Sequence, residues 1–289
     1  MRIVIINKSP KNLKGPIQKS LFESGVKVLD HSEYSQVSEG DSVLFFSGGQ
    51  EQGAINKTIS RLPKKITIGW WMCDYRKIGH FTRNLYGKFN HIFLPYKNFF
   101  NDYKKLGKDG VWYMPQSGYA FPNIDTNIGD YDAVFIGGTG TSPYHKNRPS
   151  LLKTIGSSCK LKIITGQGIS VNQTEIYSKI PLSISMSGDF MIGGCSNRLY
   201  NIMAAGGCAF VKYFEDLELI FENHKHLVWF KSNEEIKPLI EEYLKSPEKI
   251  NQIKVNAKNL FLEKHTGKCR VDNMFDIMEN KIKKFNGYL

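Results

Sequence analysis

The sequence predicts an α/β protein made of two doubly wound domains of similar type, followed by C-terminal helices. Short apolar runs alternate with amphipathic segments, which is the pattern of parallel strands separated by helices. The alternation stops between Pro115 and Asp130, where two prolines and two glycines leave no sustained periodicity, and it then starts again. We therefore expect a first domain over residues 1–115, a linker over 116–130 and a second domain over 131–289.

The expected strands are brief and rich in β-branched or aromatic residues, as buried parallel strands are. In the first domain they lie at 2–6, 42–46, 65–70, 91–95 and 110–114, and in the second at 132–138, 161–166, 182–185, 208–211 and 227–230. Residues 233–285 predict the C-terminal helices. A ligand cleft is expected between the two domains, at the carboxyl ends of the strands.

Composition narrows the class of protein. The 289 residues are 41% hydrophobic, which is enough to bury sizeable cores. No apolar run reaches the roughly 18 residues that span a bilayer, and the start lacks a secretory signal, so we expect a cytoplasmic monomer with no membrane span. The five cysteines are scattered, which indicates reduced thiols and no metal site. A net charge of +12 favours an anionic partner: nucleic acid, a phosphorylated ligand or an anionic membrane surface.

The stretch GGCSNRLYNIMAAGGCAF, residues 193–210, carries polar residues at the start of an apolar helix. If the helix begins near Ser196, whose hydroxyl could cap it, Arg198 and Asn201 share one side while the apolar residues take the other. An arginine beside free helix N-terminal amides suits a phosphate or diphosphate, and an asparagine one turn later can bind sugar hydroxyls. The alternative is a surface arginine, a tolerated asparagine and a glycine C-cap.

A glycine-rich loop follows the first strand of the second domain, in FIGGTGTSPYHKNRPSLL, residues 135–152. Its bare backbone amides could approach an anion, with His145, Lys146 and Arg148 adding charge. It matches neither GxGxxG nor the P-loop pattern, so a plain turn is the alternative.

Two stretches of the first domain follow strands. In GWWMCDYRK, Asp74 could act as a base or orient a hydroxyl, and Trp70 and Trp71 could stack on a sugar or base ring. The alternative is a pair of core aromatics and a helix-capping aspartate. In FFSGGQEQG, Gly48 and Gly49 fit either a close ligand approach or a tight turn.

The C-terminal third is more specific than these parts. SNRLYNIMAAGGCAF, followed by EDLELIFENHKHLVWF and a long helical tail containing LEKHTGKCR, resembles the C-terminal domain of CgeB-like, group 1 glycosyltransferases of the GT-B fold. The likeness covers about residues 130 to 278. The first 115 residues match only as a Rossmann-like N-terminal half, with WWMCDYRK and YMPQSGY in corresponding places.

The resemblance implies a nucleotide-sugar donor, of the UDP type, bound to the second domain and an acceptor held by the first, with no metal and no resident cofactor. Arg198 would contact the diphosphate with Arg148 nearby, and Asn201 would face the ribose, where many relatives have glutamate. The full set of expected donor contacts is Gly137, Gly138, His145, Lys146, Gly166, Asn197 and Asn201.

The implied reaction is displacement of a nucleoside diphosphate from the anomeric carbon, with Arg198 and Arg148 stabilising the leaving group. If configuration inverts, Asp74 is the first candidate base, but the resemblance favours retention, which needs none. The basic charge without an anchor is similar to that of viral enzymes that glycosylate hydroxymethylated bases, which predicts double-stranded DNA as partner. Trp70, Trp71 and Tyr75, together with Tyr96 and Phe99, are expected to be exposed for stacking on a flipped base, and Gly48 and Gly49 complete the acceptor side.

Two other functions stay open from the sequence. The acceptor could be a cell-surface polysaccharide, a lipid-linked molecule or a protein. The chain could also be a non-catalytic module that binds nucleotide or nucleic acid, a possibility favoured by asparagine at position 201.

Overall fold

The computed structural model describes residues 1–6, 21, 24–47, 52–72, 84–97, 100–104, 110–120, 128–140, 145–166, 173–187 and 192–283. By its contacts the chain divides into two compact units, Met1–Gln116 with Gly267–Gly287, and Ser117–Thr266 with Tyr288–Leu289. The first division, after Gln116, lies at the start of the segment 116–130 that was expected to be a linker, and this segment groups with the second unit. The last helix groups with the first unit, whereas the expected division placed it in the second.

The first unit contains a six-stranded parallel sheet in the order β2-β1-β3-β4-β5-β6. The strands are β1 (Arg2–Ile6), β2 (Lys27–Asp30), β3 (Ser42–Ser47), β4 (Thr67–Met72), β5 (His91–Leu94) and β6 (Val111–Tyr113). Five of the six coincide with expected strands. The edge strand β2 was not predicted, because KVLD offers only two apolar residues between charged ones.

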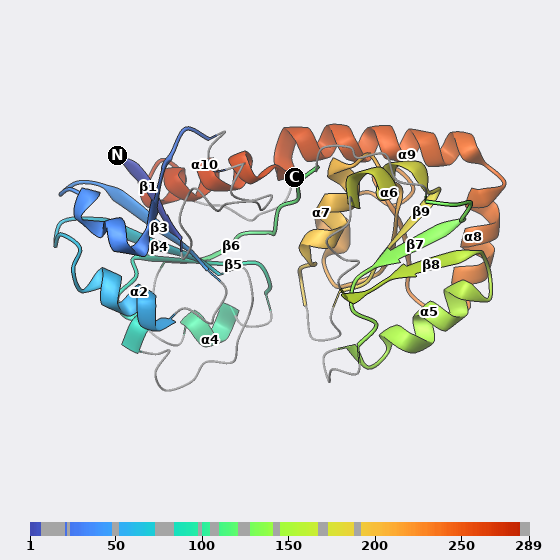
Figure 1. The fold of residues 1–289 in the computed structure, drawn as a ribbon, viewed down its shortest axis with the longest axis horizontal. Helices are drawn as coiled ribbons and strands as arrows, with labels where there is room; N and C mark the ends of the chain where they lie inside the picture. Colours follow the sequence, from blue (N-terminus) through green and yellow to red (C-terminus); the bar gives the residue numbers. More distant parts are fainter. Residues whose placement is uncertain are drawn as a thin grey trace. The chain divides into compact units, whose positions relative to one another are not determined.

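Helices cover both faces of the first sheet (Figure 1). The short helices η2 (His31–Gln36), α2 (Gln52–Ile59) and α4 (Phe100–Lys104) precede strands of this sheet, and the final helix α10 (Gly267–Met278) packs against β1, β3 and β4. A Cβ on Gly69 of β4 would lie 2.7 Å from the Met278 sulfur, so a glycine permits this close approach. The last helix therefore belongs to the first core because its apolar residues bury there.

The second unit contains a five-stranded parallel sheet in the order β11-β10-β9-β7-β8. Its strands are β7 (Ala133–Ile136), β8 (Leu161–Ile164), β9 (Leu182–Ser185), β10 (Ala209–Lys212) and β11 (Val228–Phe230). All five coincide with expected strands. Since every pairing is parallel, the carboxyl ends of β7, β8 and β9 lie side by side at one edge of the sheet.

The helices of the second unit lie on both faces of its sheet (Figure 1). The elements are α5 (Arg148–Gly156), α6 (Gln173–Lys179), α7 (Asn197–Ala204), η5 (Leu217–Leu219), α8 (Ile236–Leu244), α9 (Pro247–Leu260) and the π-helical turn η6 (Phe261–His265). Helices α5 and α8 pack on one face, and α6 and α7 on the other.

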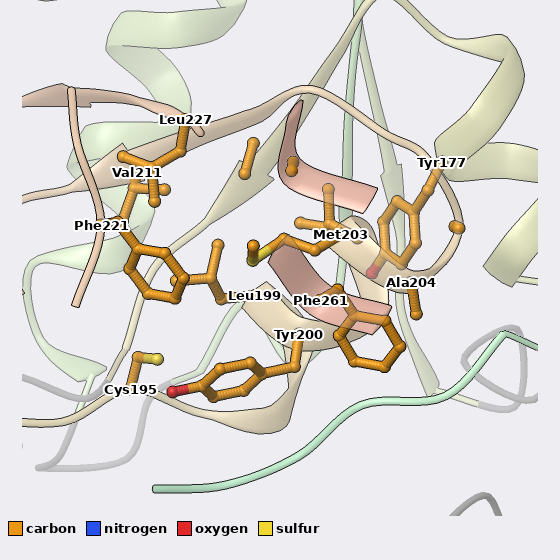
Figure 2. Close-up of a cluster of buried hydrophobic side chains, with 14 of the residues drawn as sticks. Tyr177, Cys195, Leu199, Tyr200, Met203, Ala204, Val211, Phe221, Leu227 and Phe261 are labelled. Atoms are coloured by element: carbon orange, nitrogen blue, oxygen red, sulfur yellow. The ribbon is translucent and has the colours of Figure 1, made fainter. Parts of the chain in front are cut away.

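Helix α7 is anchored by its apolar side. Figure 2 shows Leu199, Tyr200 and Met203 in the core that also contains Tyr177 of α6 and Phe261 of η6. With these side chains buried, the opposite side of the first turn of α7 is left at the carboxyl edge of the sheet. This edge carries the polar residues described next.

Candidate functional site

Two arginine side chains converge on one backbone carbonyl at the carboxyl edge of the second sheet. Arg198 is the second residue of α7, which follows β9, and Arg148 is the first residue of α5, which follows β7. Arg198 Nη1 donates to the carbonyl oxygen of Met186 at 2.9 Å, and Arg148 Nη2 donates to the same oxygen at 3.2 Å. The structure therefore brings together the two arginines that the sequence analysis placed on a diphosphate.

Each of these arginines also donates to a second carbonyl. Arg198 Nε donates to Ile136 O at 2.8 Å, and Arg148 Nη1 donates to Gly138 O at 2.7 Å. The ring of Phe135 lies near both cations, with its centre 4.8 Å from Cζ of Arg198 and 5.6 Å from Cζ of Arg148. Cation–π attraction and four hydrogen bonds thus fix the two guanidinium groups before any ligand binds.

Gly137 leaves the space that Arg198 occupies. Its φ of +152° is one that residues with side chains rarely adopt, and a Cβ there would clash with Arg198 Nη2. Gly138 is exposed, and a Cβ on it would meet nothing within 4 Å. Of the two adjacent glycines, the first is required by the position of the arginine.

The electrostatics of Arg198 distinguish it from a structural arginine. Burial lowers the pKa of its guanidinium, and the nearby Tyr177 hydroxyl opposes that effect only weakly. Within the described residues Arg198 forms no ion pair, and all of its hydrogen bonds go to neutral carbonyls. A partly buried cation that has no counter-charge among the described residues is costly, so this edge of the sheet favours binding of an anion.

Two polar hydroxyls beside Arg198 also lack partners. Ser196 occupies the N-cap of α7, but its side chain makes no capping hydrogen bond, so the expected cap is wrong. The hydroxyl of Tyr177 on α6 is buried without a hydrogen-bond partner in the part of the chain that the structure describes, and burial raises its pKa to about 12. The first turn of α7 therefore keeps backbone amides that no side-chain cap satisfies.

Asn201 has a partner that the sequence did not indicate. Its Oδ1 accepts a hydrogen bond from the backbone N–H of Tyr119 at 3.0 Å, and the residue is only 8% exposed. The adjacent Gly118 packs so closely against α7 that a Cβ would clash with the backbone of Tyr200. Asn201 thus anchors residues 117–120 through its carbonyl oxygen, while its amide Nδ2 makes no hydrogen bond to a described residue.

The other expected donor contacts lie at the same edge of the sheet. His145 and Lys146 directly precede α5, Asn197 is the exposed first residue of α7, and Gly166 follows β8 with a φ of +61°. Gly137 and Gly138 follow β7. Parallel topology therefore gathers the whole predicted set, although the residues come from three separate segments.

The expected acceptor residues of the first unit behave differently. Trp70 and Trp71 have no exposed surface, so the expectation that they stack on an acceptor ring is wrong. β4 is a central strand with both faces covered, and Trp70 packs on Tyr86 and Phe89 while Trp71 packs on Phe46.

The remaining acceptor-side expectations divide into two groups. Tyr96, also expected to be exposed, is only 3% exposed. Gly48, Gly49, Asp74, Tyr75 and Phe99 lie outside the described residues.

Sequence reasoning missed Phe135, Met186 and Tyr177 as parts of the site. A bulky aromatic two residues before a glycine pair was the available signal for Phe135, whereas a shared backbone carbonyl leaves no trace in residue type. Among the described residues, no group of three or more His, Cys, Asp or Glu side chains is arranged to hold a metal ion. None of the helices in the described ranges combines the length and apolar character needed to cross a bilayer.

Comparison with known proteins gives the architecture and its class. Residues 170–276 match a family model described as glycosyl transferase-like. No curated protein sequence matches the chain significantly.

Solved structures with the same architecture cover most of the chain. One is a DNA modifying enzyme, β-glucosyltransferase, with a TM-score of 0.61 and 12% identity, covering 97% of this chain and 100% of that one. Another is Anabaena Alr3699/HepE in complex with UDP-glucose, with a TM-score of 0.58 and 10% identity over 98% of this chain and 100% of that one. A third is TarM, with a TM-score of 0.55 and 9% identity over 82% of this chain, which spans about half, 54%, of TarM.

These matches confirm the resemblance stated from the sequence. The chain has the GT-B fold, and its enzyme class is that of the glycosyltransferases.

Proposed function

We propose that the protein transfers a hexose or pentose from a UDP-type nucleotide sugar to an acceptor hydroxyl. The observation that carries the proposal is the pair of guanidinium groups on Met186 O, of which Arg198 has no counter-charge among the described residues. Diphosphate supplies two adjacent negative charges, and the guanidinium fork matches phosphate oxygens. The UDP complexes of HepE, a protein of the same fold, support the choice of nucleotide.

In the proposed reaction the acceptor oxygen bonds to the anomeric carbon as the bond from that carbon to the diphosphate breaks. The leaving nucleoside diphosphate takes the electron pair of the broken bond, and one of its oxygens accepts the proton that the acceptor hydroxyl loses. Negative charge grows on the diphosphate, so Arg198 and Arg148, already held by neutral carbonyls and Phe135, lower the barrier without reorganising. The free amides at the start of α7 add to this stabilisation.

The acceptor that we favour is a hydroxymethylated base in DNA. Of the net charge of +12, residues 42–120 contribute +8, from twelve Lys and Arg against four Asp and Glu. A concentration of positive charge in the unit assigned to the acceptor suits a phosphodiester polymer. The fold shared with a DNA-modifying β-glucosyltransferase also supports DNA as the acceptor.

The test is release of nucleoside diphosphate from a panel of UDP- and GDP-sugars, with hydroxymethylcytosine DNA, unmodified DNA or no acceptor. We expect release from a UDP-sugar that is stimulated only by the hydroxymethylated DNA, and transfer of radiolabelled sugar to that DNA. Slow release that no DNA stimulates would overturn the acceptor and keep the transferase. Absence of release from every donor, with folded protein, would overturn the transferase.

A further inference from the structure

The positive charge of the chain is unevenly distributed. Residues 42–120 carry a net +8, whereas residues 201–250 carry six Lys and Arg against nine Asp and Glu, a net −3. A charge that merely followed amino-acid composition would be spread more evenly. The excess in the first unit therefore calls for an explanation from its own surface.

Five basic residues of this region are exposed, and we call them together the α2 basic surface: Lys57, Arg61, Lys64, Lys65 and Lys88. Lys57 lies in the last turn of α2, and hydrogen bonds from Arg61 N to Thr58 O at 2.9 Å and from Leu62 N to Ile59 O at 3.3 Å continue the coil beyond the helix. The i, i+4 spacing of Lys57 and Arg61 then places these two cations along one side of the coil, and Lys64 and Lys65 follow directly after Pro63, where the coil has ended.

A second segment joins this row. The ammonium of Lys88 donates to the Oδ1 of Asn56 at 2.6 Å, which places Lys88 beside α2. Asn90 of the same turn accepts a hydrogen bond from Ile68 N at 2.9 Å, so the turn lies against the start of β4, just after Lys64 and Lys65.

None of these five cations forms an ion pair with a described residue. Arg61 lies over the ring of Tyr34, 5.3 Å from its centre. In the second unit some exposed lysines pair with carboxylates, as Lys225 does with Glu222 and Lys249 with Glu242, whereas Lys153 and Lys258 form no ion pair with a described residue. The α2 basic surface therefore holds positive charge that no described residue neutralises.

The location separates this surface from the expected reaction site. Residues 60–66 lead from α2 into the start of β4, so Lys64 and Lys65 lie toward the amino ends of the strands. Substrates of parallel α/β sheets bind at the carboxyl ends. A ligand of this surface is therefore held away from the reacting group.

The chemistry selects the partner. Peripheral membrane surfaces combine basic residues with exposed apolar ones, but no large hydrophobic residue is exposed among the described residues of 42–120. Single strands are bound by exposed aromatic rings, and no aromatic residue is among the exposed large hydrophobics that the structure describes. A row of exposed cations without either feature fits the phosphate backbone of a duplex.

We infer that the α2 basic surface binds the phosphate backbone of double-stranded DNA, without sequence preference, and tethers the duplex whose modified base reacts elsewhere. The inference rests on the proposed DNA acceptor. It adds a binding surface that lies apart from the reacting base. Binding through this surface does not require the donor.

The test is the affinity of the full chain for a fluorescent 30-base-pair duplex, measured by anisotropy from about 50 to 200 mM salt without donor. One variant carries Lys57→Gln, Arg61→Gln, Lys64→Gln and Lys65→Gln. The control carries Lys225→Gln, Lys237→Gln, Lys245→Gln and Lys249→Gln, which removes the same charge from the second unit. We expect the slope of log K against log salt to fall by about 3–4 in the first variant and by less than 1 in the control.

The outcomes separate this inference from the proposed function. Equal loss in both variants would mean that only net charge matters and would overturn the inference, as would preferential binding of the wild type to vesicles of anionic lipid. Release of nucleoside diphosphate without acceptor reports the donor site alone. A chain that binds duplex through this surface but releases no diphosphate would keep the inference and overturn the proposed reaction.

Discussion

Arg2 in the first unit and Arg198 in the second unit have different roles, although both are held by hydrogen bonds and by an aromatic ring. Arg2 of β1 donates to Glu279 at 2.7 Å and to Asp276 at 2.5 Å, and its guanidinium lies over the ring of Phe275. Arg198 makes a similar number of hydrogen bonds and also lies over a phenylalanine, but its acceptors are the carbonyls of Ile136 and Met186. Carboxylates raise the pKa of Arg2, mainly through Glu279, whereas burial lowers that of Arg198.

The difference teaches how to separate structural from ligand-binding arginines. The carboxylates of Glu279 and Asp276 neutralise the charge of Arg2, so Arg2 stabilises the folded protein and needs no ligand. The described partners of Arg198 are neutral carbonyls, which hold it in place and leave its charge available to an anionic ligand. The guanidinium group is held in a fixed position at both sites, but only at Arg198 is its charge available to a ligand.

The largest expected effect, and the strongest test of this difference between the two arginines, comes from removing the charge of Arg198. Arg198→Ala is expected to lower kcat/KM for the nucleotide sugar by about 100- to 1000-fold, because the leaving diphosphate loses its pre-positioned donor. The matched variant Arg2→Ala, which also removes one guanidinium, should leave the kcat/KM of the folded enzyme within about twofold. Equal losses in steady-state diphosphate release would show that Arg198 has no special role.

The next effect concerns position without loss of charge. Gly137→Ala introduces a Cβ where Arg198 Nη2 lies, in a backbone conformation unfavourable for alanine, so the guanidinium must move. We expect a fall in kcat/KM of about 10- to 100-fold, as displacement of a binding group by about 1 Å can produce. Gly156→Ala is the control, since this glycine ends α5 outside the site and a Cβ on it would meet nothing closer than 3.8 Å, so its activity should be close to that of the wild type.

Substitution of Arg2, which pairs with carboxylates, is expected to change the stability of the protein and not its activity. Arg2→Met should lower the free energy of unfolding by about 1–2 kcal/mol, through lost ion pairs and the lost contact with Phe275. In the wild type, Arg2 first and Lys281 second lower the pKa of Glu279 from 4.5 to about 2. That contribution is fully present above pH 4.5 and disappears as the pH falls toward 2.

Urea unfolding between pH 2 and 7 measures this dependence. The difference between wild type and Arg2→Met should shrink on acidification within that window. A constant difference across the range would mean that the ion pairs contribute nothing to stability.

The smallest effect is expected at Phe135, which positions both site cations. Phe135→Leu keeps an apolar residue but removes the π face, and a cation–π contact is worth about 1 kcal/mol. We expect the KM for the donor to rise about 3- to 10-fold, with kcat changed by less than twofold. Phe210→Leu is the control, because Phe210 stacks on Phe230 on the same face of the sheet. A similar rise in KM in the Phe135→Leu and Phe210→Leu variants would mean that Phe135 contributes only to packing of the core.

Much of this fold follows from the sequence because buried parallel strands are written as apolar runs. Ten of the eleven strands coincide with such runs, and the exception, β2, is an edge strand with few apolar residues. The partner of α10 is not encoded locally. Its apolar face indicates burial, but the sheet that receives it begins more than 250 residues earlier.

The residues of the candidate site that the sheet topology positions could be predicted from the sequence. The individual hydrogen bonds of the site could not. Arg148 and Arg198 stand at the first turns of helices that follow strands, so the parallel sheet brings them to one edge. The carbonyl of Met186 and the partner of Asn201 depend on loop conformation, which residue type does not encode. Trp70 and Trp71 misled because aromatic residues in a strand suit a core and a ligand platform equally.

The packing of α10 on the first sheet has a consequence for synthesis on the ribosome. Residues 117–266 are translated after β6 and before α10, which at about 5–20 residues per second takes roughly 8–30 s. During that interval the β-sheet face formed by Val4, Leu44 and Phe93 lacks α10, which supplies five buried residues of this core: Val271, Met274, Phe275, Ile277 and Met278. Nascent chains of this protein are therefore expected to depend on chaperones until translation ends, and truncations lacking α10 to aggregate.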